Sequence, residues 1–509
     1  MRNHDVDPST MTTTRESDSA QGDTRVASES GVDSARRFAS NIFWMLLSQA
    51  GGKIAGFAFI IIVAHGLGTT DYGYFSFAVS FVPLFLLPWG IDIVVVSEIA
   101  KDHRRLSEVF SSGFVLRFGL QVIGLLVCFS LMPFLVSGTA ARATVVIVGC
   151  SLFLDEISGF LGNVFQAFEQ MRLQSLITVT NRILSTLLAI VAIELGGNLI
   201  AIAFVYFLGS VGALVVAWAA LRRRFPPIRL GDRNMTFIRY LLRSGVALGV
   251  AYMLNMALFR IDVVLLQAIS GAAAVAMYGI ALRFLDSFLF FSWGVMNAAL
   301  PRIARASDDS ERVRVIEMTA AIMLAFYVPL AIWGLFSAKW MVEAIFPARY
   351  AGAAPAVPWL AAAGMFYAVA FLVRVLAIVD GQRLTLIWIA AFGVVANVGL
   401  NAVVIPHYGF VGAAVVTFVS EVLDAALLLI LFVRSNWRLY KSRAALVPIT
   451  AGAVTTLTLL GLGAQGARAF LLGGTFYAVA LVTSGRLIAP SESKKAIELL
   501  RRRPKSATA

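Results

Sequence analysis

The stretch RIDVVLLQAISGAAAVAMYGIALRFLD, residues 260–286, is the one from which the rest of the chain is interpreted. It joins the end of one apolar segment to the start of another through a small-residue turn at Ser270 and Gly271. The two segments carry four ionisable residues, which are Arg260, Asp262, Arg283 and Asp286. Because charges are costly within apolar helices, four of them in so short a stretch indicate a specific role.

An earlier stretch of the chain is similar to this one. GTTDYGYFSFAVSF (68–81) aligns without gaps on GAAAVAMYGIALRF (271–284). The similarity continues as PWGI (88–91) on SWGV (292–295) and as EIA (98–100) on RIA (302–304). This spacing predicts two related halves of about 200 residues each, and internal repeats of that size are typical of transporters.

Composition identifies an integral membrane protein. Apolar residues make up 59% of the chain and charged residues 14%, with a mean hydropathy of +0.82. Soluble chains carry about 25% charged residues. The net charge of +13 does not indicate nucleic-acid binding, because the basic residues lie in short loops between apolar runs.

The N-terminal segment and the two cysteines are not expected to form part of a functional site. Residues 1–37 are polar, without apolar periodicity, and are expected to be disordered. The first apolar run begins near Ile42 and is long enough to span, so we expect it to stay in the protein as the first helix. Cys128 and Cys150 lie inside apolar segments without metal-ligand spacing, and no disulfide is expected.

The apolar runs predict fourteen membrane spans of about 20 residues each. They are expected near residues 42–65, 74–98, 109–136, 144–166, 173–194, 199–221, 245–268, 275–299, 318–340, 355–379, 386–405, 410–433, 445–463 and 468–488.

The basic residues of the loops test this count. With a cytoplasmic N-terminus, the outside loops carry three of them, Arg142, Arg349 and Arg468, and the inside loops carry twenty. The twenty are Lys101, Arg104, Arg105, Arg172, Arg222, Arg223, Arg224, Arg229, Arg233, Arg239, Arg243, Arg302, Arg305, Arg312, Arg314, Arg383, Arg434, Arg438, Lys441 and Arg443. An error of one span would scramble the alternation, so the asymmetry supports the count of fourteen spans and predicts that both termini are cytoplasmic.

The predicted architecture is therefore an all-α membrane protein of two six-helix lobes plus two further helices. We expect a cytoplasmic N-tail (1–37), an N-lobe (38–221), a basic cytoplasmic linker (222–244), a C-lobe (245–443), spans 13 and 14 (444–488) and a basic cytoplasmic tail (489–509). Small residues at Gly66, Gly68, Gly271 and Ala272 suit close packing where the lobes meet.

Thirteen ionisable residues fall at membrane depth, where they are expected to face water or a partner. The basic set is Lys53, Arg117, Arg182, Arg260, Arg283 and Arg374, and the acidic set is Asp92, Asp155, Glu156, Asp262, Asp286, Glu421 and Asp424.

Spacing divides these residues into candidate pairs and candidate ligands. Arg283 and Asp286 are three apart and can pair on one helix face, which leaves a structural and a substrate role equally open. Arg260 and Asp262 point to different faces, so mutual pairing does not explain both. Lys53 lies among glycines at the middle of span 1, where it is poorly placed to reach an interface.

We select five basic residues as candidate substrate ligands and four acidic residues as candidates for coupling to protons or Na⁺. The substrate candidates are Lys53, Arg182, Arg260, Arg283 and Arg374, of which Arg374 also suits an interfacial position. The coupling candidates are Asp155, Glu156, Glu421 and Asp424, because buried carboxylates exchange protons readily; structural pairing is the competing interpretation.

Signals of catalysis are weak. The four histidines, His4, His65, His103 and His407, form no close cluster. Gly52 and Lys53 lack the other residues of a phosphate-binding P-loop. No catalytic residue, metal or cofactor is predicted, and the chain is interpreted as a carrier and not an enzyme.

Three stretches resemble the polysaccharide-transport family of lipid-linked oligosaccharide flippases, within the multidrug/oligosaccharidyl-lipid/polysaccharide exporter superfamily. They are AHGLGTTDYGYFSFA (64–78), residues 260–284 and NVGLNAVVIPHYGFVGAAVVTFVSEV (397–422). The last has the Asn-x-x-x-Asn, Ile-Pro and Gly-x-x-Gly-Ala-Ala pattern of the family's span 11 to 12 hairpin. The resemblance covers residues 38–488.

The resemblance implies a multi-pass protein of the bacterial inner membrane. It would flip undecaprenyl-pyrophosphate-linked repeat units by rocking two lobes around a central cavity, in the lipid bilayer and in possible contact with glycan polymerase machinery. Intramembrane basic residues bind the pyrophosphate in related peptidoglycan-precursor flippases, where two extra helices shape a lipid groove. Spans 13 and 14 are similar in position.

Two other functions stay open. A cation-coupled drug exporter of the same superfamily would more usually have twelve spans and an acidic residue in span 1, where this chain has Lys53. A membrane glycan polymerase or ligase would need a sizeable outside loop with catalytic residues, and the outside loops are short.

Overall fold

The computed structural model describes residues 51–86, 90–306, 308–436 and 444–488. Every regular element in these ranges is a helix, as the composition predicted. The expectations for the two tails, 1–37 and 489–509, concern residues outside the described ranges.

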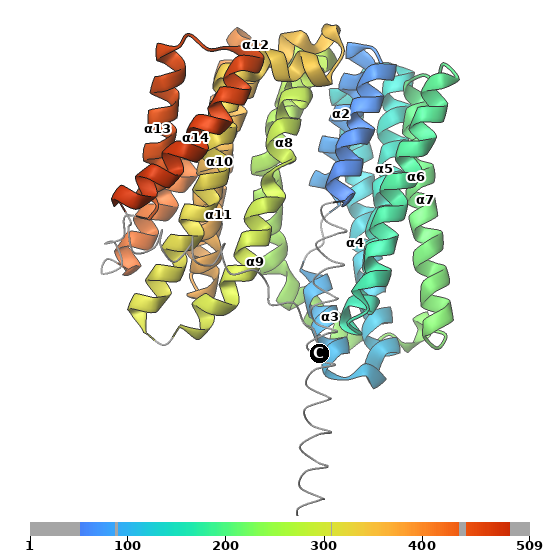
Figure 1. The fold of residues 1–509 in the computed structure, drawn as a ribbon. Helices are drawn as coiled ribbons and strands as arrows, with labels where there is room; N and C mark the ends of the chain where they lie inside the picture. Colours follow the sequence, from blue (N-terminus) through green and yellow to red (C-terminus); the bar gives the residue numbers. More distant parts are fainter. Residues whose placement is uncertain (1–50, 87–89, 307, 437–443, 489–509) are drawn as a thin grey trace, which may run out of the picture.

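Nine of the apolar helices make a single pass through the bundle (Figure 1). They are Gly51–Gly66, α4 (Leu106–Leu135), α5 (Thr139–Ala167), α6 (Met171–Glu194), α7 (Leu199–Arg224), α10 (Asp309–Ile345), α11 (Val357–Val379), α13 (Leu446–Gly461) and α14 (Gly466–Ile488).

Two longer helical stretches turn back on themselves and make two passes each. α8 (Met235–Asp286) reverses at Gly271, whose φ is 77°, and α12 (Arg383–Asn436) reverses at Gly409, whose φ is 54°. Side chains with a Cβ rarely adopt positive φ, so glycine permits a turn this tight between antiparallel helices. The expected small-residue turn at 270–271 is therefore where the chain reverses.

The second pass of each half is broken near its middle. α2 (Thr69–Phe81) continues into a short 3₁₀ helix (Val82–Leu84), and α3 begins at Ile91 and ends at Lys101. In the other half, Ser287 and Phe288 separate α8 from α9 (Leu289–Arg305). The breaks fall at related positions of the internal repeat, and the apolar runs gave no sign of them. With these broken passes, the described residues make fourteen passes, as predicted.

The helices form two bundles with α8 between them (Figure 1). α2 to α7 lie on one side and α9 to α14 on the other. α2 packs tightly on the second pass of α8, because a Cβ on Gly73 would meet the Ala272 carbonyl oxygen at 1.9 Å. Ser76 lies against Gly279, and these two residues are aligned partners in the repeat.

The last two helices pack on the outside of the second bundle, against α10. The Trp333 indole N–H donates to the Phe470 carbonyl at 3.0 Å, and the Ser337 hydroxyl donates to the Gly466 carbonyl at 2.9 Å. α14 is thereby held by its first turns to α10.

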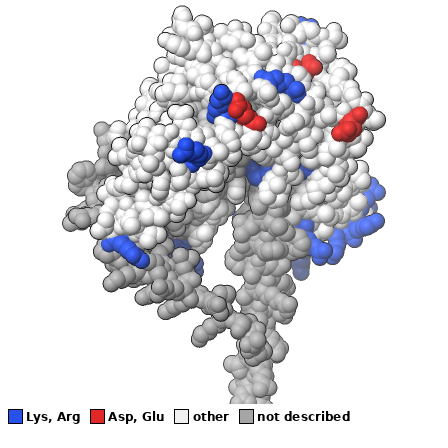
Figure 2. All heavy atoms as spheres, turned by 45° about the horizontal axis from the view of Figure 1, so that its top comes forward, with Lys and Arg blue, Asp and Glu red and all other residues white. Residues whose placement is uncertain are grey.

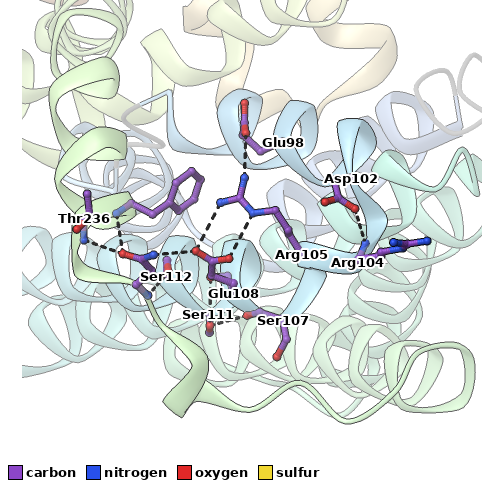
Figure 3. Close-up of polar contacts among 11 residues, drawn as sticks. Glu98, Asp102, Arg104, Arg105, Ser107, Glu108, Ser111, Ser112 and Thr236 are labelled. Carbon is purple, nitrogen blue, oxygen red and sulfur yellow. Dashed lines mark hydrogen bonds and ion pairs between the residues drawn. The ribbon is translucent and has the colours of Figure 1, made fainter.

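The connection between the bundles is fastened to the start of α4 (Figure 3). α7 extends to Arg224 and α8 begins at Met235, so the connection is shorter than the expected linker. Ser107 donates to the Asp232 carboxylate at 2.6 Å, and the Asn234 amide donates to Glu108 at 2.9 Å.

The start of α8 also belongs to the first bundle. Phe237 and Leu241 are buried in the same apolar cluster as residues of α3, α4 and α5. Asn234 caps this helix end by accepting from the backbone N–H groups of Thr236 and Phe237 at 2.9 and 3.2 Å.

We predict that Asn234→Ala lowers stability by about 1 to 2 kcal/mol, because it removes the helix cap and the hydrogen bond to Glu108. Asn234→Ser keeps a capping oxygen and should lose less. Thermal unfolding of the purified protein in detergent measures both. Equal apparent Tm values for the alanine variant and the parent would show that the cap is unimportant.

Candidate functional site

Basic side chains from the first helix and from both passes of α8 gather around one carboxylate, that of Asp286. The Arg260 guanidinium donates from both Nη atoms to Asp286 Oδ2 at 3.3 Å, and Arg283 donates to the same oxygen at 3.4 Å. Lys53, on the first helix, lies within Coulombic range of Asp286, Arg182, Arg260 and Arg283. We call Lys53, Arg182, Arg260, Arg283 and Asp286 the central cluster.

The central cluster has an excess of positive charge. Lys53, Arg260 and Arg283 face Asp286, and Arg182, which lies near Lys53, faces Asp155. Arg182 also lies beside the Tyr206 hydroxyl. The predicted Arg283–Asp286 pair is present. Arg260 binds the same carboxylate oxygen, so one negative charge faces two guanidinium groups. Such a cluster can hold a multiply charged anion.

An apolar hollow of about 540 Å³ opens beside Lys53. Its walls come from the first helix, the segment from the end of α8 to the start of α9, α10 and α14, and among its fourteen lining residues only Lys53 is charged. Its aromatic residues are Phe57, Phe284, Phe288, Phe290, Trp333, Trp340 and Phe470. A positively charged site thus adjoins a space suited to hydrocarbon.

A second ionic cluster lies within the first bundle. The buried Arg117 of α4 donates to Asp92 of α3 and to Glu156 of α5. Asn163 donates to the other oxygen of Asp92 at 2.9 Å. Glu156, a coupling candidate from the sequence, is therefore an ion-pair partner. Its neighbour Asp155 accepts from the Asn181 amide at 2.5 Å.

The second bundle holds the remaining candidates from the sequence. Arg374 of α11 donates to Asp424 of α12, and this pair is separate from the central cluster. Glu421 lies one turn away and is 5% exposed. It lies within Coulombic range of Asp424, Arg374 and Asp262, and no hydrogen bond reaches it from the described residues.

The sequence-based selection of coupling residues did not include Asp262. This residue is 1% exposed, accepts from Tyr278 and from Thr417, and has one carboxylate oxygen, Oδ1, without a partner in the described part of the chain. It points away from Arg260, as the two-residue spacing indicated. The contact with α12 depends on how the helices pack, which spacing alone does not reveal.

The Asn-x-x-x-Asn pattern lies beside Asp262's partners. Asn397 donates to Ser420 at 3.1 Å, and Asn401 donates to Asn397 at 2.9 Å. Because α12 reverses at Gly409, Asn401 lies at the level of Thr417 on the returning pass. The Oδ1 atom of Asn401 has no partner among the described residues. Two acceptor oxygens thus have no partner in the described part of the chain, Asn401 Oδ1 on α12 and Asp262 Oδ1 on α8.

The family comparison covers the first half of the chain. Residues 38–287 match the family described as polysaccharide biosynthesis protein, in agreement with the resemblance seen in the sequence. Two uncharacterised membrane proteins of Methanocaldococcus jannaschii, MJ1375 and MJ1068, are each 21% identical. The matches cover 74% of this chain and 94% and 80% of those proteins.

Solved structures with a similar fold are membrane transporters. The lipid II flippase MurJ in an inward closed conformation has a TM-score of 0.64 at 12% identity, covering 90% of this chain and all of that one. A multidrug resistance MATE family transporter of the MOP superfamily, inward-facing, has a TM-score of 0.60 at 16% identity, covering 77% and 96%. These likenesses confirm the predicted all-α membrane-protein fold.

We predict that Arg374→Met destabilises the protein by roughly 3 to 5 kcal/mol, because it leaves the buried Asp424 without its counter-charge. The double variant Arg374→Met with Asp424→Leu should recover most of this loss. Unfolding in detergent measures it.

The more exposed pair of Arg312 and Asp380 provides the control. Arg312→Met should cost under about 1 kcal/mol. If Arg374→Met were as mild, Arg374 would not be held in a structural pair.

Proposed function

We propose, on the premise that the chain belongs to the polysaccharide biosynthesis protein family, that it flips polyprenyl-pyrophosphate-linked oligosaccharide repeat units across the bacterial inner membrane. The observation that carries the proposal is the central cluster beside the apolar hollow. A pyrophosphate would bind Lys53, Arg182 and Arg260, and the start of the polyprenyl chain would lie among the aromatic residues of the hollow.

The solubility of a lipid-linked sugar explains why the central cluster and the apolar hollow would lie side by side. A sugar headgroup cannot cross hydrocarbon, and a polyprenyl tail is insoluble in water. A carrier therefore needs a polar site at membrane depth that stays in contact with the lipid phase. In this chain Lys53 borders both the charged cluster and the hollow, so it lies where head and tail would join.

Alternating access supplies the movement. The central cluster takes its residues from α6 of the first bundle, from the first helix and from α8, so relative movement of the bundles would change the access to it. We place the lower end of Figure 1 in the cytoplasm, with both termini there. Figure 2 shows the opposite end, which carries few charged side chains, as the loop asymmetry requires.

The coupling ion would bind in the second bundle. Of the four expected carboxylates, Glu156 and Asp424 are ion-pair partners of arginines, and Asp155 is hydrogen-bonded to Asn181. Glu421 has no such partner and lies near Asp262, whose Oδ1 is also unpartnered within the described residues. We propose that these two carboxylates exchange a proton or Na⁺ with the gradient.

The same buried carboxylates would suit a cation-coupled drug exporter of the superfamily, so the cargo needs a direct test. Deletion of the gene should make a polyprenyl-pyrophosphate oligosaccharide accumulate on the cytoplasmic leaflet and remove surface polysaccharide, because flipping supplies later polymerisation. Lipid extraction measures the accumulated oligosaccharide, and glycan staining measures the surface polysaccharide. Drug sensitivity with unchanged surface glycan would support the exporter instead.

Variants then locate the cargo site. The triple variant Lys53→Ala, Arg182→Ala and Arg260→Ala should lower surface glycan at least tenfold at equal protein level, because it removes most of the charge that faces the pyrophosphate. The matched control is Arg312→Met with Asp380→Leu, which removes a charge pair outside both the cluster and the proposed coupling site. Normal export by the triple variant would exclude the central cluster as the headgroup site.

Glu421→Gln should abolish gradient-driven transport while leaving substrate binding intact, because an amide cannot release a proton or balance a cation. Asp380→Asn, in the exposed pair with Arg312, is the control and should transport normally. Reconstituted vesicles with an imposed gradient measure the difference. Transport that responds equally to the gradient in both variants would contradict coupling at Glu421.

A further inference from the structure

One arginine of the second bundle binds the end of the first helix. Arg349 lies in the 3₁₀ helix Ala348–Ala356, between α10 and α11. Its Nη2 donates to the carbonyl oxygens of Ala64 and His65 at 2.8 and 2.6 Å. These carbonyls are in the last turn of the helix Gly51–Gly66, where they have no partner within the helix and carry the negative end of its dipole.

The next residue adds a second contact between the same segments. The Tyr350 hydroxyl donates to the Leu67 carbonyl at 3.2 Å, and its side chain is completely buried. Its ring packs edge-on against Tyr72 of α2, with centroids 5.4 Å apart. Arg349 and Tyr350 therefore hydrogen-bond to backbone carbonyls at the turn between the first helix and α2.

These contacts join the two bundles. The first helix packs on α6 of the first bundle, where Gly66 lies against Ile193 and the Thr186 hydroxyl donates to the Ala55 carbonyl at 3.4 Å. Arg349 and Tyr350 connect α10 to α11 in the second bundle. The 3₁₀ helix Ala348–Ala356, which contains both residues, lies at the upper end of Figure 1.

We infer that Arg349 is a latch that holds the outer side of the carrier closed, with Tyr350 as its support. The inference rests on the alternating access of the proposed function. The bundles cannot separate at this end while the guanidinium bonds both carbonyls, so the open state loses these bonds. A contact made in one state alone shifts the equilibrium toward that state.

The first bundle contains a matched arginine that does not cross between the bundles. Arg142 follows α4, the third pass of its half, as Arg349 follows α10, the third pass of the other. Its Nε donates to the Val136 carbonyl at 2.9 Å and its Nη2 to the Pro133 carbonyl at 3.5 Å. Both arginines bind carbonyls at a helix end, but only Arg349 joins the two bundles.

The test measures access from outside to a cysteine beneath the latch. Ser76→Cys is introduced into full-length protein in which Cys128→Ala and Cys150→Ser remove the native thiols. Ser76 is 3% exposed and faces Gly279, so it reacts only when the bundles part. A membrane-impermeant thiosulfonate is added to intact cells, and the labelling rate is measured.

Arg349→Ala should raise the labelling rate about tenfold, because it removes a charge-assisted contact present only in the closed state. Tyr350→Phe, which loses one hydroxyl and keeps the ring, should raise it by about threefold. Arg142→Ala should label at the parent rate. An unchanged rate in Arg349→Ala, or an equal rise in Arg142→Ala, would overturn the inference.

Two measurements keep the result interpretable. Elution from size exclusion and thermal unfolding show whether each variant folds, and Arg349→Gln, which keeps a donor without charge, replaces the alanine variant if it does not. With Arg349→Gln the rate should again exceed that of the parent. Labelling involves no cargo, so the latch can hold even if the exported molecule is a drug and the flippase proposal is wrong.

Discussion

Everything in this structure depends on the cost of charge in hydrocarbon. Thirteen ionisable side chains lie at membrane depth, and each must find a partner or a polar space. The fold places five of them in two closed groups. Arg117 joins Asp92 and Glu156 in the first bundle, and Arg374 joins Asp424 in the second. The others include the central cluster, with its positive excess around Asp286, and Glu421, which has no ion-pair partner among the described residues.

Under the proposed function, this division would separate the groups that bind cargo from the groups that bind the coupling ion. The central cluster adjoins an apolar hollow and can hold an anion attached to a lipid. Under the proposed function, Asp262 of α8 and Glu421 of α12 would respond to an ion gradient. Cargo and coupling would thus use separate groups, linked through α8, which carries Arg260 toward the cluster and Asp262 toward α12.

The sequence predicted the features that follow from local composition. Apolar run lengths located fourteen passes, and the alignment of residues 68–81 with 271–284 predicted the repeat in which Ser76 meets Gly279. Partners across helices could not be predicted, because spacing along one helix does not show which neighbour it faces. Arg374 looked like a candidate ligand for that reason, and Asp262 was left out. The broken second passes were equally hidden, since apolar residues continue on both sides of each break.

The hydrogen bonds between the 225–234 connection and α4 determine where a fluorophore can report relative movement of the two bundles. Since residues 225–234 are bonded to α4, and Phe237 and Leu241 are buried with the first bundle, the solvent-exposed loop around Gly231 travels with that bundle. A fluorophore inserted there reports on the first half alone. A partner dye belongs on a helix of the second bundle, such as α12, where Gly393 packs on Leu258 of α8.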